Sequence, residues 1–124
     1  MNAIHRCTLI FEGTSKLYRV NVQGKELQIP LRDILYFETG RHVTVIHTLT
    51  DTISITKVLS EVCEDFEQNP EFIRIGRSYL INRLYVRNVD QTEVEMMDSA
   101  VIPIPVRLQK EIRQQLKGDR FSKT

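Results

Sequence analysis

The sequence predicts a mainly β domain, built of several short strands with two short helices. It contains 34 β-branched residues (13 Ile, 11 Val and 10 Thr) but 2 Ala, and branched side chains suit a pleated sheet better than a helical bundle. Apolar residues alternate along most of the chain, whereas helical spacing is found in two segments. A length of 124 residues is typical of one domain.

The predicted strands are short apolar or alternating segments bounded by turn residues. They cover residues 7–11, 17–22, 25–29, 34–38, 42–47, 52–56, 72–75, 79–81, 85–89, 93–97 and 101–104. Turns are expected at Gly13-Thr14-Ser15, Gln23-Gly24 and Thr39-Gly40, and Pro30 is expected to interrupt strand pairing because it lacks an N–H. Within residues 42–47, the odd- and even-numbered side chains should face opposite sides of the sheet.

The first predicted helix spans residues 57–67. Apolar side chains recur there at helical intervals, Thr56 or Ser54 is available as N-cap, and Asn69-Pro70 provides a stop signal. Its exposed face is acidic, so this helix would repel phosphate and is a poor candidate for entering a DNA groove. The acidic side chains are Glu61, Glu64, Asp65 and Glu67.

The second predicted helix spans residues 106–117, with Val106, Gln109, Ile112 and Leu116 near one face. The domain organisation predicted from these elements has three parts. Residues 1–16 form an N-terminal extension with a short strand, residues 17–117 form the main domain, and residues 118–124 form a C-terminal tail.

Charge is sorted into blocks, although the net charge is only +1. Residues 71–87 carry +3 and residues 101–124 carry +4, whereas residues 51–70 and 88–100 carry −4 each. A fold that gathers the basic blocks on one side would create a surface for a polyanion. The alternative is that each block is simply a solvated face.

Several function classes find no support in the sequence. There is no P-loop, GxGxxG, GxSxG or HExxH motif, so we expect neither catalysis nor a cofactor. His42 and His47 should lie on opposite faces of a strand, which is poor geometry for a metal site. Cys7 and Cys63 form no CxxC pair, and no signal peptide or membrane-length apolar run is present, which favours a cytoplasmic protein with reduced thiols.

One stretch is more specific than the rest. Residues 72–82 (FIRIGRSYLIN) resemble the signature of the LytTR DNA-binding domain, found at the C-terminus of many bacterial response regulators. Residues 31–38 (LRDILYFE), with the loop 39–42, and residues 101–107 (VIPIPVR) are similar to two further family segments, in the same order. The resemblance covers about residues 17–117 and departs at Gly76, where the family usually has histidine, so no base contact is expected there.

This resemblance implies an elongated β fold that binds double-stranded DNA through loops entering neighbouring major grooves. The family's base-contacting positions fall on His42, Arg77 and Arg107. Arginine can donate two hydrogen bonds to guanine, and histidine can bond a purine N7 or an exocyclic amine. From spacing alone, an arginine at a strand end is more often a solvated charge or part of a surface ion pair.

Other polar residues receive supporting roles. Arg41, Arg83, Lys110 and Arg113 are candidates for phosphate contacts, which position a domain without distinguishing sequences. Arg74 lies inside a predicted strand, where a pairing with an acidic neighbour is an equal alternative to DNA contact. Ser78 and Asn82 are expected to hold the turn through side-chain-to-backbone hydrogen bonds.

The predicted function is therefore sequence-specific DNA binding in bacterial transcriptional regulation. Family members usually follow a receiver domain, for which this chain has no space, so it is either a fragment of a longer regulator or a standalone one. Paired direct repeats in the DNA and weak contact between two bound copies are further expectations from the resemblance. The alternative function is a small all-β interaction module whose basic face binds an acidic protein partner.

Overall fold

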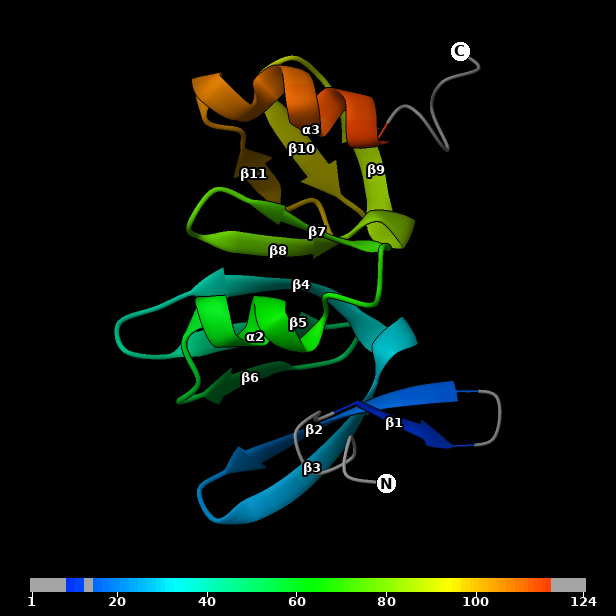
Figure 1. Ribbon diagram of the computed structural model, residues 1–124, viewed down its shortest axis with the longest axis vertical. Coiled ribbons are helices and arrows are strands. Elements are labelled where there is room, and N and C mark those ends of the chain that lie inside the picture. Colours follow the sequence, from blue (N-terminus) through cyan, green and yellow to red (C-terminus); the bar gives the residue numbers. More distant parts are fainter. Residues whose placement is uncertain (1–8, 13–14, 117–124) are drawn as a thin grey trace.

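The computed structural model describes residues 9–12 and 15–116 (Figure 1). The strands are β1 (Leu9–Glu12), β2 (Ser15–Val22), β3 (Lys25–Pro30), β4 (Ile34–Thr39), β5 (Thr44–Thr48), β6 (Thr52–Ile55), β7 (Phe72–Ile75), β8 (Tyr79–Asn82), β9 (Val86–Val89), β10 (Glu93–Met96) and β11 (Val101–Pro103). The α-helices are α2 (Leu59–Asp65) and α3 (Gln109–Leu116), and the 3₁₀ turns are η1 (Leu31–Asp33), η2 (Arg83–Tyr85) and η3 (Val106–Leu108). The predicted mainly β fold with two short helices is confirmed.

The described strands form three antiparallel sheets that follow one another along the long axis of the molecule (Figure 1). The N-terminal sheet has the order β1-β2-β3, the central sheet β6-β5-β4-β8-β7, and the C-terminal sheet β11-β10-β9. Helix α2 packs beside the central sheet and α3 beside the C-terminal sheet (Figure 1). The elongated shape expected from the family resemblance follows from this row of small sheets.

The described residues form two hydrophobic cores, one on each face of strand β4. Ile34 and Phe37 belong to the first core, whereas Leu35 and Tyr36 belong to the second, because the register with β5 shifts between Ile34 and Tyr36 and interrupts the strict alternation. Strand β4 is therefore buried along four consecutive residues. It shows no alternation of buried and exposed side chains, because both of its faces are covered. Strand β5 shows the predicted alternation, with Thr44 and Ile46 fully buried and the residues between them partly exposed.

The first core joins the N-terminal sheet, the central sheet and α2. Its centre is an aromatic cluster in which the ring of Phe66 lies 4.8 Å from that of Tyr18 and 5.2 Å from that of Phe37, both edge-on. The Tyr18 hydroxyl also donates a hydrogen bond to Asp65 at the end of α2 (2.8 Å). The N-terminal sheet is thus attached to the central sheet through its own core residue.

Helix α2 is shorter than predicted, because residue 57 is held outside it. The Lys57 carbonyl accepts a hydrogen bond from the Thr44 hydroxyl (2.6 Å), and the Lys57 ammonium pairs with Asp65 (2.6 Å). Val58 takes the N-cap position without a side-chain hydrogen bond. The predicted caps Ser54 and Thr56 are therefore wrong, since the chain leaves β6 and turns before the helix begins.

The prediction for the last helix is corrected at its start. Residues 106–108 form the 3₁₀ turn η3, and α3 begins only at residue 109. Ile112 and Leu116 are buried as predicted, but Val106 is 83% exposed. A 3₁₀ turn has a different angular period from an α-helix, so the apolar face does not extend back to Val106.

Smaller differences arise where a turn replaces a predicted strand end. Residues 40–43 form the turn before β5, and Tyr85 belongs to η2 rather than to β9. The 7–8 part of the first predicted strand, the Gly13-Thr14 turn and the 118–124 tail lie outside the described residues. The helices of the described chain are too short and too polar to cross a bilayer.

Asn82 connects the two halves of the central sheet, and its removal should destabilise the fold. Its side chain is buried, donates to the Ile34 carbonyl (2.9 Å) and accepts from the Leu84 N–H (3.0 Å). Asn82→Ala is expected to lower the free energy of unfolding by about 2–3 kcal/mol, because one buried and one partly buried hydrogen bond are lost. Urea denaturation measures the change. Asn88→Ala, at an exposed position of β9, is the control, and equal effects of both variants would contradict this role.

Candidate nucleic-acid interface

The turn between β4 and β5 presents the first pair of candidate residues. In this turn, the Gly40 N–H donates a hydrogen bond to the Val43 carbonyl (2.9 Å), which closes four residues into a turn. His42 adopts a left-handed backbone conformation with φ of 62°, and both Arg41 and His42 are exposed. A side chain at residue 40 would lie 2.9 Å from Val43. The turn therefore needs glycine at residue 40 and projects the two following side chains into solvent.

The turn between β7 and β8 lies directly beside the end of β4. The Thr39 N–H donates to the Ser78 carbonyl (2.9 Å), and the Thr39 hydroxyl donates to the Arg77 carbonyl (3.2 Å). Arg74 also donates from Nε to the Gly76 carbonyl (2.9 Å). Of the two alternatives for Arg74, the described contacts show no acidic partner, and contact with DNA stays a prediction. Arg74 braces the turn that carries Arg77.

The segment ahead of α3 packs against this same turn. Gly76 has φ of 65°, and a Cβ atom at that residue would lie 3.2 Å from Cγ of Pro105. A small cavity of about 200 Å³ remains between the turn and the segment, lined by Tyr79, Ile104 and Pro105 among others. In this chain, glycine accommodates both the left-handed backbone conformation and the close approach to Pro105, where a Cβ atom would be strained and crowded. Arg107 follows Pro105 by two residues, so it comes close to the Arg77 turn.

Residues 39–43, 76–78 and 104–107 therefore form one continuous surface, which we name the loop edge. Figure 1 shows the β4–β5 turn, the β7–β8 turn and the connection from β11 to α3 on the same side of the molecule, at the left. The three predicted base-contacting residues lie on it: His42, Arg77 and Arg107. Although they are separated by 35 and 30 positions in the sequence, the fold brings them to one edge.

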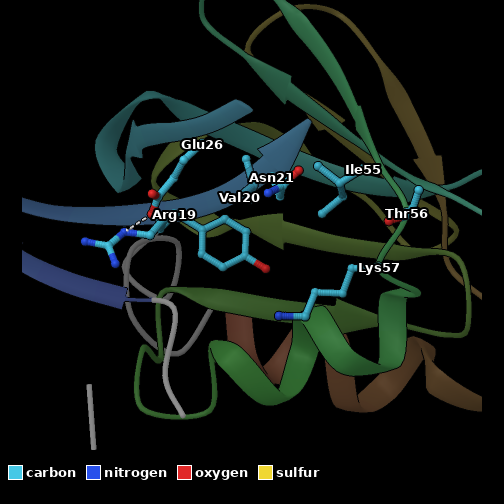
Figure 2. A pocket seen from close by; sticks show the side chains of 8 residues that line it. Arg19, Val20, Asn21, Glu26, Ile55, Thr56 and Lys57 are labelled. Carbon is cyan, nitrogen blue, oxygen red and sulfur yellow. Dashed lines mark ion pairs between the residues drawn. The ribbon is translucent and has the colours of Figure 1, made fainter. Parts of the chain in front are cut away.

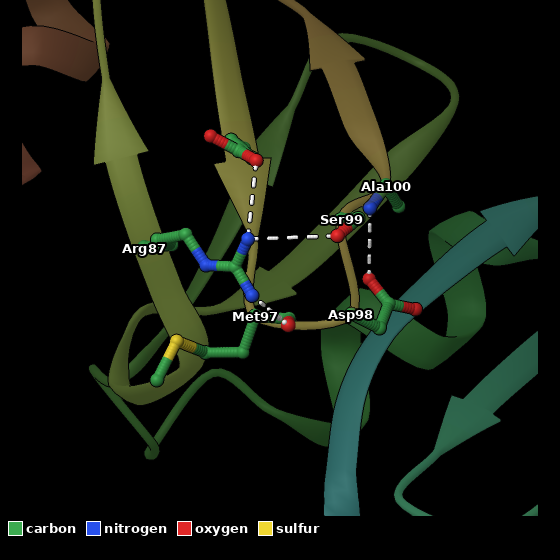
Figure 3. Close-up of polar contacts among 6 residues, drawn as sticks. Arg87, Met97, Asp98, Ser99 and Ala100 are labelled. Carbon is green, nitrogen blue, oxygen red and sulfur yellow. Dashed lines mark hydrogen bonds and ion pairs between the residues drawn. The ribbon is translucent and has the colours of Figure 1, made fainter.

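The two arginines of the loop edge that are predicted to contact bases are available for a ligand. Arg77 and Arg107 are both exposed, and their guanidinium groups contact no hydrogen-bond or ion-pair partner among the described residues. Arg87 in the C-terminal sheet shows the opposite situation (Figure 3): it donates to the Met97 carbonyl (2.6 Å) and lies 3.4 Å from a Glu95 oxygen. The loop-edge arginines are thus unlike an arginine that holds the fold together.

The phosphate-contact candidates are divided by the structure. Arg41 lies on the loop edge, and exposed Lys110 lies in the first turn of α3, just after it. Arg83 lies in η2, at the opposite end of β8 from Arg77. Arg113 is partly buried, and its charge helps to lower the pKa of Asp90, although the backbone N–H groups that this carboxylate accepts have the larger effect. The structure does not bring Arg83 and Arg113 to the loop edge.

A larger groove, which the sequence did not predict, separates the N-terminal sheet from the end of β6 (Figure 2). Its volume is about 450 Å³. Both of its cations are paired, Arg19 with Glu26 (2.5 Å) and Lys57 with Asp65 (2.6 Å). The groove arises from contact between two sheets, so no local sequence pattern marks it, and it lies apart from the loop edge.

His47 and Cys63, the other histidine and the cysteine among the described residues, take part in the packing of the fold. His47 stacks on Tyr36 with ring centres 4.2 Å apart and contacts Glu38 through Nε2 (2.9 Å). Cys63 packs against the first core, and burial raises the pKa of its thiol, as suits the small apolar role expected for it. In the described part of the chain, no group of three His, Cys, Asp or Glu side chains is arranged to hold a metal ion.

Comparison with known proteins identifies the family. The model of the LytTr DNA-binding domain matches residues 24–117. The chain belongs to this family. The match confirms the family resemblance drawn from residues 31–38, 72–82 and 101–107. A LytTR domain is a non-catalytic domain that binds DNA in transcriptional regulation.

A solved LytTR structure confirms the fold independently. It is the LytTr DNA-binding domain of a protein described as a methyl-accepting/DNA response regulator from Bacillus cereus. The two chains superpose with a TM-score of 0.65 at 20% identity, over 84% of this chain and 98% of the other. No curated protein matches the chain. The likeness at this identity concerns the fold, and the roles of individual loop residues rest on the geometry above.

The packing of Gly76 on Pro105 can be tested by adding a methyl group. Gly76→Ala should destabilise the LytTR domain by about 1–3 kcal/mol, because alanine is strained at positive φ and must also push Pro105 away. Gly24→Ala is the matched control, since Gly24 has φ of 82° but no atom within 4 Å of an added Cβ. Urea denaturation should show the larger loss for Gly76→Ala. Equal losses would mean that the contact with Pro105 does not restrain the loop edge.

Proposed function

We propose that this LytTR domain recognises a specific double-stranded DNA sequence by placing the loop edge in the major groove. The observation that carries the proposal is the convergence of three turns, through the Thr39–Ser78 hydrogen bond (2.9 Å) and the Gly76–Pro105 contact. Side chains fixed on adjoining turns can contact several base pairs at once. The domain therefore needs no recognition helix.

Arg77 and Arg107 are proposed to contact guanine. Each guanidinium can donate two parallel hydrogen bonds to guanine O6 and N7, a pattern that the other bases do not offer in the major groove. His42 completes the set from the β4–β5 turn, where its imidazole can donate to a purine N7 or accept from an exocyclic amine. The free guanidinium groups and the exposed imidazole support this assignment.

Arg41 and Lys110 are proposed to contact phosphates at the two ends of the loop edge. Their exposure and their positions beside His42 and Arg107 support this role. Phosphate contacts fix the register of a protein on the duplex without distinguishing sequences. Arg83 and Arg113 are left out of the proposed interface, because they lie away from the loop edge.

Helix α2 is not proposed to enter a groove. Its exposed side chains Glu61 and Glu64, with Glu67 just beyond its end, are acidic, and no arginine or lysine lies in its sequence. The helix instead covers the first core. Loops, rather than this helix, are the elements with the charge that DNA requires.

The proposed biological setting is bacterial transcriptional regulation in the cytoplasm. Two copies bound side by side at paired direct repeats, with weak contact between them, and regulation through a receiver domain are parts of this proposal. They are supported by membership of the LytTR family. Residues 17–117 are taken as the DNA-binding unit.

Specificity distinguishes this proposal from an interaction module that binds an acidic protein. A random-duplex selection with sequencing should enrich a repeated motif.

On that motif, Arg77→Ala and Arg107→Ala should each weaken binding by about 1–3 kcal/mol, with a much smaller loss on random duplex. Fluorescence anisotropy measures both affinities, and Lys25→Ala, at an exposed position of β3 away from the loop edge, is the control. Equal losses on both duplexes would assign the arginines to the backbone, and failure to enrich any motif would favour the protein partner.

Lys110→Ala should weaken binding to every duplex by a similar factor, because a phosphate contact does not depend on sequence. The logarithm of the binding constant should also fall less steeply with the logarithm of salt concentration, by about 0.9 for one lost phosphate contact. Titrations between low and physiological salt measure this slope. An unchanged slope would remove Lys110 from the interface.

A further inference from the structure

Val106 stands out on the loop edge because an apolar side chain there is turned into solvent. It is 83% exposed, whereas the other exposed large apolar residues of the described chain range from 38% to 56%. A single exposed apolar residue is common on protein surfaces and by itself indicates nothing. The position of Val106 is what distinguishes it: it lies between Pro105, which packs on the Arg77 turn, and Arg107.

The backbone around Val106 is held in place from both sides. Pro105 is fixed by its contact with Gly76, and its carbonyl accepts from the Leu108 N–H (2.8 Å), which closes η3. The Gln109 side chain donates to the Ile104 carbonyl (3.2 Å). Valine itself has few rotamers, because it is branched at Cβ. The two methyl groups are therefore presented in a nearly fixed direction, one residue before Arg107 in the same 3₁₀ turn.

We propose that Val106 contacts the 5-methyl group of a thymine adjacent to the guanine that Arg107 contacts. This inference rests on the proposed function, since it requires the loop edge to lie in the major groove. Thymine is the base that presents a methyl group there, and apolar side chains contact it preferentially. Contact between the valine methyl groups and the thymine methyl group removes all of them from water, which is favourable. Without such a contact, the apolar surface of Val106 stays exposed to water.

The proposal has a consequence for the DNA target. The preferred motif should contain an A·T pair next to one particular G·C pair. That G·C pair is the one that no longer contributes to binding affinity when Arg107 is changed to alanine. The recognised feature is the methyl group itself, not the Watson–Crick identity of the pair. Deoxyuridine, which lacks only that methyl group, should therefore be a poorer partner than thymidine at this one position.

Single replacement of each thymidine by deoxyuridine in the selected motif tests the inference. For the unmodified domain, one replacement next to the Arg107-dependent guanine should weaken binding about fourfold, the equivalent of about one buried methyl group. For Val106→Ala, binding to the thymidine duplex should be weakened by a similar factor, and the same deoxyuridine replacement should have little further effect. Val101→Ala, at a position of β11 that is 51% exposed, is the matched control and should keep the full response to deoxyuridine.

The outcomes separate the inference from the proposed function. If a motif is enriched and depends on Arg107, but no deoxyuridine replacement beside that guanine changes affinity, the methyl contact is wrong while the proposed function stands. If the deoxyuridine effect persists unchanged in Val106→Ala, another residue contacts the methyl group and the inference is overturned. If no sequence-specific binding is found at all, the proposed function itself fails. Circular dichroism of Val106→Ala should match that of the unmodified domain, because the side chain is exposed.

Discussion

The packing of Gly76 against Pro105 is the contact on which the proposed interface depends. It adds a restraint between the β7–β8 turn and the segment before α3, whose neighbouring residues Ile75 and Ile104 are both buried in the second core. A positive φ and a close approach are needed at the same residue, and glycine alone supplies both without cost. Without this contact, Arg77 and Arg107 would still be exposed, but one restraint on their separation would be lost.

A second constraint works from inside the sheet. Strand β4 is covered on both faces, and Thr39 at its end holds the Arg77 turn through two hydrogen bonds. Burial of β4 therefore determines where the turns emerge, and the turns need no long side-chain network of their own. The loop edge is positioned by rigid elements, which lowers the entropic cost of ordering it on a ligand.

The sequence predicts the elements of this fold better than their ends. Short apolar runs and alternating segments between turn residues located the strands: β5 shows the alternation, whereas β4 was found by its apolar run because both of its faces are covered. It could not predict that Lys57 would be held by Thr44 and Asp65 outside α2, since that contact joins residues from separate elements. Likewise, helical periodicity placed Val106 on a buried face, whereas a 3₁₀ turn directs it outward. The site followed the same rule: the family motif indicated the loop residues, but only the fold separates Arg41 and Lys110 from Arg83 and Arg113.

The use of turns rather than a helix has a physical consequence for how such a domain can distinguish sequences. A recognition helix places side chains at a fixed spacing of 1.5 Å per residue along one line. Turns from separate strands are spaced by the sheets instead, where neighbouring strands lie about 4.8 Å apart, so each contact can be altered without shifting the next. In this chain the same turn segment holds an apolar residue and a cation side by side, Val106 and Arg107. With the proposed contacts, these two residues favour one order of neighbouring base pairs, because reversing that order would set the guanidinium against a methyl group and the valine against polar base edges.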